Sequence, residues 1–374
     1  MHSARRSTPA TEIENLRSLG DALASGRPLT GLRLQDLDLT AYQEALLART
    51  DVEGMVVLGG RLPEALDAHL RAHHALVFPT DPAAPIDPYR ATLYAPEDLY
   101  AGLGDGGYEA TPDFRAYEWF QDATVRRDAL VTLLRAIHDD SITDALDEFI
   151  GDRPVVGVMG GHALQRGSTA YSEAARLGHL LATTGLVVAT GGGPGAMEAA
   201  NLGALVADAQ RLQRALEALA AVPSFRPSVR AWAELALQVR RGLEPNGIPR
   251  SVGIPTWFYG HEPPNVFCDG IGKYFSNAVR EDGLLARSTA GLVVLEGAAG
   301  TVQEVFQALT PRFYAAPGSV QPPLVLVGQE YWADTVPVWP AIRALGQGRP
   351  LADTMHLVDS IDEAAALVTA RGKD

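Results

Sequence analysis

The sequence predicts a doubly wound α/β protein with a mostly parallel sheet, preceded by a smaller α/β domain. From residue 155 onward, short apolar runs typical of buried β-strands alternate with helical segments. Three of these runs end in glycine-rich turns, as strands do when they lead directly into helices. Alternation of this kind places helices on both faces of a parallel sheet.

Residues 1–150 form the smaller domain in this prediction, and their role is not evident. Short apolar runs are separated there by helical or proline-rich stretches, which suggests a small α/β unit. The runs lie at 54–58, 75–78 and 91–94. Two apolar sets with helical spacing between residues 120 and 150 predict one or two connecting helices. Gly151-Asp-Arg-Pro154 then interrupts the pattern, so we place the domain boundary at residue 150.

Residues 151–374 form the second predicted domain. Its expected strands lie at 155–159, 186–190, 251–255, 291–295 and 322–327. Its expected helices run from about 168 to 184, from about 196, and from the turn at 297–301. An Ala-, Leu- and Arg-rich stretch at 203–243 predicts two further helices inserted before the next strand.

Composition excludes several classes of protein. The 374 residues include 45 acidic and 31 basic side chains, a net charge of −14, and no basic block that would follow a phosphate backbone, so we expect no nucleic-acid partner. No apolar run approaches the roughly 18 residues that cross a bilayer, and no apolar stretch follows Arg5 and Arg6 to form a secretory signal. We therefore expect a cytoplasmic protein without a membrane partner.

Three glycine-rich turns are the predicted functional site, because ligands bind outside the carboxyl ends of the strands in such sheets. The turns begin near Gly160, Gly191 and Gly297. Backbone N–H groups of 191–197, with the start of the following helix, can cradle an anion such as a phosphate. Glycines that merely allow tight turns are the alternative.

A dinucleotide-binding enzyme is a weaker interpretation of the same turn. Gly191, Gly193 and Ala196 satisfy the degenerate G-x-G-x-x-A pattern. The acidic residue expected about 20 positions later, at the end of a second strand, falls instead in the helical insert.

The third turn carries Thr301 and, three residues later, Glu304. Thr301 can cap the helix and donate to a phosphate oxygen. Glu304 has the spacing of a capping-box partner, and a carboxylate close behind an anion site can also be a catalytic group. The spacing alone leaves both interpretations open.

Together these residues resemble the LOG family of phosphoribohydrolases, which have a Rossmann-like fold. The family signatures G-G-G-x-x-G-x-M and P-G-G-x-G-T-x-x-E correspond to Thr190-Gly-Gly-Gly-Pro-Gly-Ala-Met197 and Glu296-Gly-Ala-Ala-Gly-Thr-Val-Gln-Glu304. The resemblance covers residues 155 to about 330. Within the family, the segments Gly160-Gly-His162 and Glu262-Pro-Pro-Asn265 and the separate N-terminal domain are more similar to bacterial nucleotide 5′-monophosphate nucleosidases.

The resemblance implies hydrolysis of the N-glycosidic bond of a nucleoside 5′-monophosphate, without a cofactor or metal. It implies that Glu304 stabilises the ribosyl centre and orients water. It also implies a catalytic arginine before the third turn, which is Arg280 or Arg287, with Arg280 the better match in spacing. Surface ion pairs with Glu281 and Asp282 are the alternative role for both arginines.

The candidate residues for substrate and phosphate binding come from the turns and the matched motifs. They are Gly160, Gly161, His162, Gly191, Gly192, Gly193, Gly195, Ala196, Met197, Glu198, Asn265, Gly297, Gly300 and Thr301. Three of them have an alternative role that needs no ligand. In that interpretation His162 is a structural residue, Glu198 interacts with the helix dipole, and Asn265 adopts a left-handed turn conformation.

Further residues and one departure complete the prediction. His73 and His74 lack a cluster of metal ligands, and Cys268 lacks an evident base, so we expect neither a metal site nor a reactive thiol. Glu296 and Ala298 replace the family's Pro and second Gly, so a nucleotide-binding sensor without catalysis is the alternative function. The resemblance also implies a homodimer or higher homo-oligomer, and the N-terminal domain could cover the site or bind a regulator.

Overall fold

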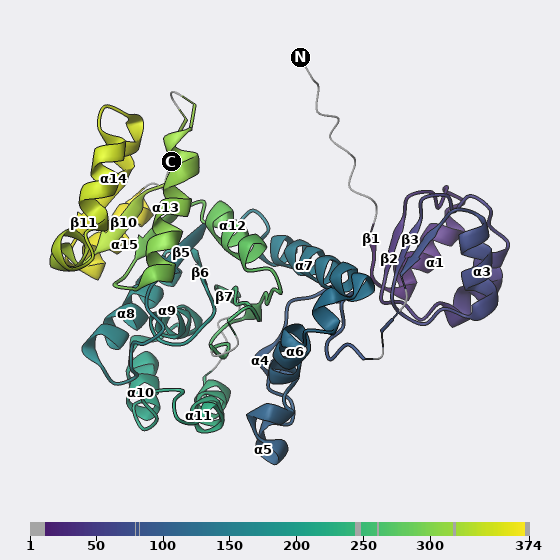
Figure 1. Cartoon of the computed structure of the whole chain (residues 1–374), viewed down its shortest axis with the longest axis horizontal. Helices are drawn as coiled ribbons and strands as arrows, with labels where there is room; N and C mark the ends of the chain where they lie inside the picture. The colour runs from purple at the N-terminus through teal and green to yellow at the C-terminus, as the bar shows by residue number, and fades with distance from the viewer. Residues whose placement is uncertain are drawn as a thin grey trace. The chain divides into compact units, whose positions relative to one another are not determined.

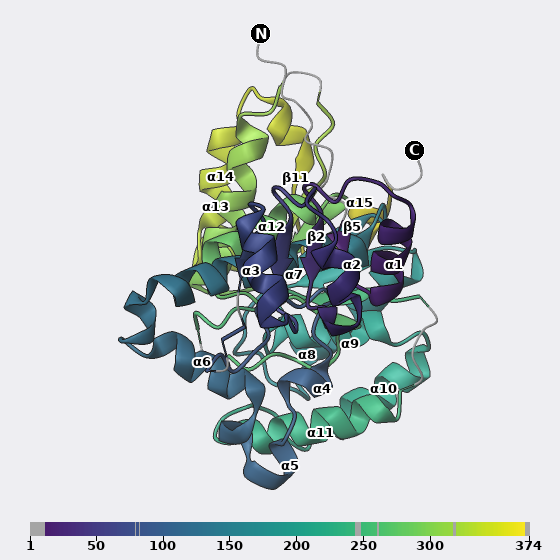
Figure 2. The same cartoon turned by 90° about the vertical axis from the view of Figure 1, so that its right-hand side faces the viewer.

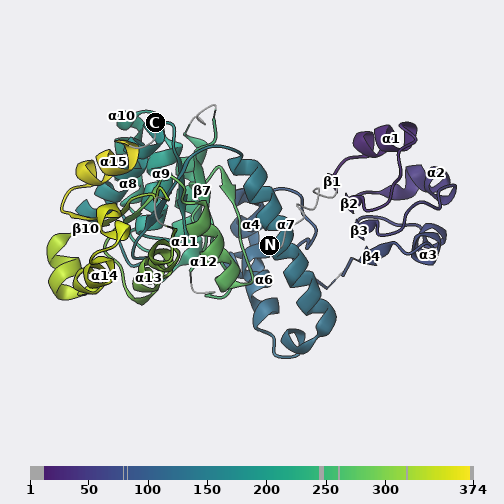
Figure 3. The same cartoon turned by 90° about the horizontal axis from the view of Figure 1, so that it is seen from above.

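A computed structural model describes residues 12–78, 80–81, 83–243, 248–259, 262–316 and 319–370. The chain divides into two compact units (Figures 1–3). The first comprises Met1–Thr92 and Asp128–Asp144, and the second comprises Leu93–Arg127 and Ala145–Asp374. Residues 1–11, and with them Arg5 and Arg6, lie outside the described residues, as do two prolines of the 79–85 stretch.

The first unit is a small α/β structure. Its four strands pair in parallel in the order β1-β2-β3-β4. The strands are β1 (Glu12–Ile13), β2 (Arg33–Gln35), β3 (Val56–Leu58) and β4 (Leu76–Phe78), and the helices are α1 (Leu16–Ala24), α2 (Gln43–Leu47) and α3 (Glu64–Ala72). Leu19, Leu34, Leu46, Val57 and Leu66 are core residues. The sequence prediction of strands at 54–58 and 75–78 is confirmed.

The second unit contains a seven-stranded sheet in which all strand pairs are parallel. Its order is β11-β10-β9-β5-β6-β7-β8. The strands are β5 (Val155–Met159), β6 (Val187–Thr190), β7 (Ser251–Gly253), β8 (Gly270–Ile271), β9 (Gly291–Val294), β10 (Leu324–Val327) and β11 (Met355–Val358). The central strands are buried over their whole length, as their continuous apolar sequences predict.

Helices cover both faces of this sheet, as a doubly wound fold requires (Figure 3). The helices are α8 (Thr169–Thr183), α9 (Ala196–Leu205), α10 (Ala209–Leu219), α11 (Val229–Arg241), α12 (Asn277–Arg287), α13 (Ala299–Phe313), α14 (Val338–Gly346) and α15 (Ile361–Thr369). On one face, α8, α9 and α15 pack against β5, β6 and β9 through a buried apolar core that includes Leu177, Val188 and Val293. The predicted Rossmann-like α/β fold class is confirmed.

Residues 93–127 pack with the sheet of the second unit. They form α4 (Pro96–Leu99), α5 (Leu103–Gly106) and α6 (Pro112–Gln121). Asp113 of α6 accepts hydrogen bonds from Trp257 Nε1 at 2.9 Å and Lys273 Nζ at 2.5 Å, and all three side chains are buried. Tyr94 forms an isolated antiparallel bridge with Ile271, so the expected strand at 91–94 is wrong.

One helix, α7 (Ala129–Ile150), contributes to both units, because its first part belongs to the first unit and its last turns belong to the second. The compact units therefore interleave along the chain, whereas the sequence analysis placed one boundary at residue 150. Short helical turns complete the structure at Leu39–Tyr42, Tyr108–Ala110, Val125–Arg127, Tyr331–Thr335 and Pro350–Thr354. Among the described residues, no helix is both long enough and apolar enough to cross a membrane.

Candidate active site

The three glycine-rich turns meet at one edge of the second unit's sheet. They follow β5, β6 and β9, which are adjacent strands in the order β9-β5-β6. The N–H of Gly161 donates to Glu296 O at 2.9 Å, and the N–H of Ala196 donates to Gly161 O at 3.1 Å. The turn after β5 is thus hydrogen-bonded to both of the other turns. The three turns therefore lie side by side at the carboxyl ends of the strands.

Glycine is required at two positions of the turn between β6 and α9. Gly192 has φ +70°, and a Cβ there would lie 2.6 Å from Pro255 Cδ. Gly195 has φ +73°, and a Cβ there would lie 2.5 Å from Gly161 O. Positive φ and close backbone approach both exclude a side chain, so this turn brings its main chain close to the first turn.

A buried network of side-chain hydrogen bonds supports the same turn. Thr190 Oγ1 accepts a hydrogen bond from the Gly192 N–H at 2.9 Å and donates to Asn201 Oδ1 at 2.6 Å. Asn265 Nδ2 donates to Gly193 O at 3.1 Å and to Asn201 Oδ1 at 3.0 Å. The fully buried Asn265 therefore supports the turn. The suggested left-handed conformation of Asn265 is wrong, because its φ is not positive.

The third turn leads into α13, whose N-cap is Ala298, without a side-chain cap. Thr301 is the third residue of the helix, so the predicted cap at Thr301 and its capping box with Glu304 are wrong. The reason is local: the extended conformation of Ala298 starts the helix at Ala299. Thr301 packs against Gly297, where a Cβ would lie 2.2 Å from Thr301 Oγ1. Gly300 is exposed with open space around its Cα.

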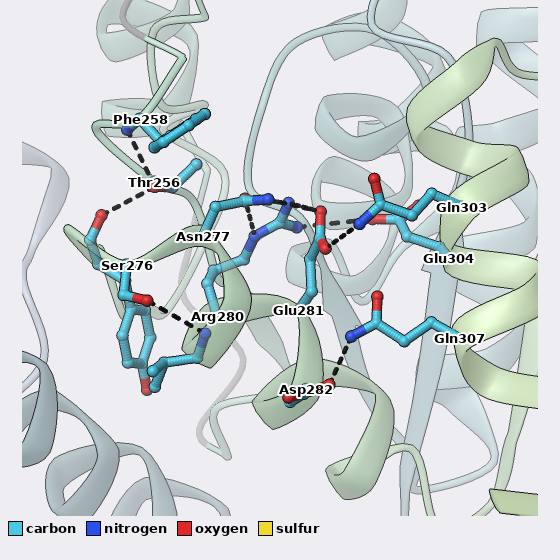
Figure 4. Close-up of polar contacts among 12 residues, drawn as sticks. Thr256, Phe258, Ser276, Asn277, Arg280, Glu281, Asp282, Gln303, Glu304 and Gln307 are labelled. Atoms are coloured by element: carbon cyan, nitrogen blue, oxygen red, sulfur yellow. Dashed lines mark hydrogen bonds and ion pairs between the residues drawn. The ribbon is translucent and has the colours of Figure 1, made fainter. Parts of the chain in front are cut away.

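Glu304 and Arg280 face each other across α13 and α12 (Figure 4). Glu304 Oε1 lies 3.5 Å from Arg280 Nη1, and their side chains are only 13% and 9% exposed. Arg280 Nη2 also donates to Asn277 Oδ1 at 2.9 Å and to Glu281 Oε1 at 3.1 Å. Gln303 Nε2 donates to Glu281 Oε2 at 2.5 Å. The guanidinium is therefore fixed in orientation before any ligand binds.

Arg280 also approaches the turn between β6 and α9. Its Nη1 lies 3.2 Å from the position that a Cβ on Gly191 would occupy, and Met197 Sδ lies 2.9 Å from that position. Arg287 is different: its Nε donates to Asp147 Oδ1 at 2.7 Å, and its Nη1 donates to Gly283 O. The structure places Arg280 beside Glu304, whereas Arg287 pairs with α7.

The environment of Glu304 favours its neutral form. Burial raises the pKa of the Glu304 carboxyl to about 7, and the carboxylates of Glu281 and Glu262 add to the rise, although the Arg280 guanidinium opposes it. Near neutral pH, Glu304 is consequently present both as carboxylate and as carboxylic acid. A group with this pKa can hold or release a proton during a reaction at physiological pH.

The side chains of His162 and Glu262 are in polar contact beside the turn between β6 and α9. His162 Nδ1 lies 3.1 Å from Glu262 Oε1. Glu262 Oε2 lies 3.6 Å from the position of a Cβ on Gly193. Sequence reasoning did not nominate Glu262 as a site residue, although it is the first residue of the Glu-Pro-Pro-Asn segment that ends at Asn265.

Glu198 is committed elsewhere in the structure. It forms a two-point ion pair with Arg166, and both side chains are 1% exposed. The guanidinium of Arg166 lies 4.6 Å from the ring centroid of Trp232 and donates to the Trp232 carbonyl. Glu198 thus fastens α9 to the loop after β5 and to α11. Sequence reasoning missed Arg166, because nothing in its local pattern marks a buried cation.

The residues that depart from the family pattern are exposed. Ala298 and Glu296 both face solvent, and Glu296 Oε1 lies 3.2 Å from the position of a Cβ on Gly328.

Gly160 packs closely on α9, since a Cβ there would lie 2.8 Å from Ala196 Cβ. Cys268 is buried, and burial raises its thiol pKa well above the ordinary range.

The second strand that a dinucleotide site requires is not close behind the glycine turn. Along the chain, two helices, α10 and α11, separate α9 from β7 (Figure 1). Arg211, which lies 20 residues after Gly191, is in α10. The acidic residue at a strand end that would bind the ribose of a dinucleotide therefore has no counterpart at that spacing.

Part of the chain matches a known protein family. Residues 153–211, from β5 into α10, match the family model described as SLOG cluster4 family. No curated protein matches the sequence. The match supports a LOG-like superfamily relationship for this segment, which carries two of the three glycine-rich turns.

Solved structures of molybdenum cofactor proteins are similar to the chain at low identity. The molybdenum cofactor binding protein of the phototrophic bacterium Rippkaea orientalis is 20% identical, with a TM-score of 0.36, over 59% of this chain and 98% of that one. The molybdenum cofactor carrier protein of Chlamydomonas reinhardtii is 19% identical, with a TM-score of 0.36, over 59% and 99%.

Proposed function

We propose that the chain hydrolyses the N-glycosidic bond of a nucleoside 5′-monophosphate and releases the free base and ribose 5-phosphate. One observation carries the proposal: the Glu304 carboxyl, which is only 13% exposed, contacts the Arg280 guanidinium, which itself lies beside the Gly191 turn. An anion cradle next to an ionisable carboxyl suits a substrate that has a phosphate at one end and a glycosidic carbon at the other.

The phosphate would bind to backbone N–H groups of the turn at 191–197, at the start of α9, other than those of Gly192 and Ala196, which donate within the protein. Arg280 projects toward the same turn and can donate to a phosphate oxygen or to ribose hydroxyls. The ribose would then lie against Glu304. This order matches the chemistry, because the Glu304 carboxyl, which is 13% exposed and has a raised pKa, would face the reacting carbon while the turn holds the phosphate.

The reaction breaks the bond between ribose C1′ and the base nitrogen, and a water oxygen forms a new bond to C1′. As the base departs with the bonding electron pair, positive charge develops at C1′ and O4′. Glu304 as carboxylate stabilises this charge and accepts a proton from the attacking water. Glu304 then returns the proton to solvent or to the departing base, so that one water is consumed per base released.

The proposal is tested with purified full-length protein and a panel of nucleoside 5′-monophosphates and the corresponding nucleosides. Chromatography should show free base and ribose 5-phosphate in equal amounts from at least one monophosphate. The matching nucleoside should react much more slowly because it lacks the anchoring phosphate. If none of the monophosphates releases base, the protein is not a phosphoribohydrolase for these substrates.

A nucleotide sensor of the same fold is the second candidate function. Ala298 and Glu296 stand where the family pattern has Gly and Pro, at the exposed start of α13. The Ala298 methyl group and the Glu296 carboxylate change the surface that a nucleotide phosphate would meet. Binding of a monophosphate without release of base would favour this function, and the reverting variant Glu296→Pro with Ala298→Gly should then restore hydrolysis.

A further inference from the structure

One loop of the second unit contacts the glycine turn at two separate points. At its start, Ile254 N–H donates to Thr190 O at 2.9 Å, and Pro255 packs against Gly192. At its end, Glu262 approaches Gly193, and the Asn265 N–H donates to Gly192 O at 2.8 Å. The loop therefore leaves the turn and returns to it, so the described residues on both sides of the loop are anchored beside the candidate site.

Two exposed aromatic side chains lie between the contacts. Phe258 is 49% exposed and Tyr259 is 39% exposed, and their ring centroids are 4.9 Å apart in an edge-to-face arrangement. Large aromatic side chains are usually buried, because exposing their apolar surface to water is unfavourable. The hydrolysis described above makes no use of either ring.

Contacts of both its ring and its backbone hold Phe258 in place. Its ring packs on Phe120 of α6 with centroids 6.5 Å apart, and Phe120 packs on Phe275 at 5.7 Å. Its backbone N–H donates to Thr256 Oγ1 at 3.0 Å (Figure 4). Thr256 Oγ1 in turn donates to Tyr274 O at 3.0 Å. The backbone and one side of the aromatic pair are thus fixed, while much of the Phe258 ring remains accessible to a ligand.

We propose that Phe258, together with Tyr259, forms a platform on which the base of the nucleotide stacks. This inference rests on the proposed function. With the phosphate at the glycine turn and the ribose at Glu304, the base is the remaining apolar and aromatic part of the substrate. Stacking on an aromatic ring is tolerant of base identity, and a two-ring purine gains more than a one-ring pyrimidine because it overlaps a larger area.

The test compares two ligands that share the ribose 5-phosphate group and differ in whether its anomeric carbon carries a base or a hydroxyl group. Full-length wild type, Phe258→Ala and Phe258→Leu are titrated by calorimetry with adenosine 5′-monophosphate and with ribose 5-phosphate. Both variants should bind the nucleotide about fivefold or more weakly, since stacking is lost. Their affinity for ribose 5-phosphate should stay within about twofold of wild type, because that ligand has no base to stack. Phe258→Leu keeps apolar contact with Phe120, so it separates loss of the ring from loss of packing.

A matched control removes an exposed aromatic side chain elsewhere. Tyr314, which is 79% exposed, follows α13 ten residues after Glu304, or roughly 15 Å along the helix axis. Tyr314→Ala should leave the affinity for both ligands unchanged. A Phe258→Trp variant should restore nucleotide binding, because it retains an aromatic face.

Other outcomes overturn the inference in distinguishable ways. Equal losses for both ligands would mean that Phe258 only supports the turn, and no loss for either would mean that the base lies elsewhere. A change in molar mass of the Phe258 variants by light scattering would assign the rings to a contact between copies of the chain. If wild type binds neither ligand, the proposed function fails together with the platform.

Discussion

At the residue scale, α12 shows how neighbouring side chains give two arginines different roles. Arg280 and Arg287 are seven residues apart and share one helical face by spacing, yet Arg280 meets Glu304 and Glu281 while Arg287 meets Asp147 of α7. Asn277, one turn before Arg280, fixes the Arg280 guanidinium with a hydrogen bond. The neighbours of each arginine, rather than its place in the sequence, separate the two candidates.

Arg280→Ala is expected to lower the rate of base release by about tenfold or more, equivalent to about 1.4 kcal/mol of barrier. The cause is loss of a charged donor that faces both the glycine turn and Glu304. Arg287→Ala is the matched control and should retain the wild-type rate. Steady-state kinetics of both variants check this, and an equal loss in the two variants would contradict the assignment.

The raised pKa of Glu304 makes stability depend on pH. The folded protein holds the proton up to about pH 7, whereas the unfolded chain releases it near 4.5. Between these values the folded state binds more protons, so the free energy of unfolding falls as pH rises from about 4.5 to 7. This rise in the pKa of Glu304 corresponds to a change in the free energy of unfolding on the order of 3 kcal/mol.

Glu304→Gln should remove this pH dependence, because glutamine resembles the neutral acid. The stability of the variant relative to wild type should therefore be greater at pH 8 than at pH 5. Urea unfolding at both pH values measures the difference. A constant difference across that range would contradict the raised pKa.

At the scale of elements, backbone conformation fixes the turn between β6 and α9 against the turn after β5. Gly195 has a positive φ, and any Cβ there would meet the carbonyl oxygen of Gly161, which itself accepts from Ala196 N–H. The first and second turns therefore hold one another in place. Gly300, in the first turn of α13, has open space around it.

Gly195→Ala should lower the free energy of unfolding by at least about 1 kcal/mol and abolish tight binding of ribose 5-phosphate, since the turn must move. Gly300→Ala should instead leave stability unchanged or raise it by up to about 1 kcal/mol, because alanine favours a helix. Thermal unfolding and calorimetry test the pair. Equal effects of the two substitutions would contradict the described turn.

The sequence predicted five of the seven strands of the second unit, because continuous apolar runs bounded by turn residues are typical of buried parallel strands. It did not predict β8, which has only two residues, or the edge strand β11, whose sequence includes His356. It failed at 91–94, where Tyr94 pairs with a residue nearly 180 positions away. The capping interpretation of Thr301 also failed, since the backbone of Ala298 sets the helix start. Long-range partners such as Arg166 for Glu198, and Glu262 for His162, are set by tertiary packing that local patterns do not encode.

At the scale of the whole molecule, the helices of residues 93–127 belong with the site-bearing sheet. The buried ion pair of Asp113 and Lys273 connects α6 to the segment after β8, and Tyr108 also donates to Asp113 at 2.8 Å. The predicted domains 1–150 and 151–374, the cytoplasmic location, the homo-oligomer and the role of the N-terminal domain stay predictions.

Asp113→Ala should destabilise the full-length protein by about 3 to 5 kcal/mol, because Lys273 would be left as an unpaired buried cation. Asp67→Ala, which breaks the exposed pair with Arg71, should cost less than about 1 kcal/mol. Chemical denaturation compares them. A small effect of Asp113→Ala would mean that the segment is not integrated into the second unit.

The most direct test of the central claim is the rate of base release by Glu304→Gln at pH 7, measured beside its affinity for ribose 5-phosphate. The account predicts at least a tenfold lower rate, about 1.4 kcal/mol of barrier, with ribose 5-phosphate still bound. This result would assign Glu304 to the chemistry rather than to folding or phosphate binding. A variant that releases base as fast as wild type would contradict the account.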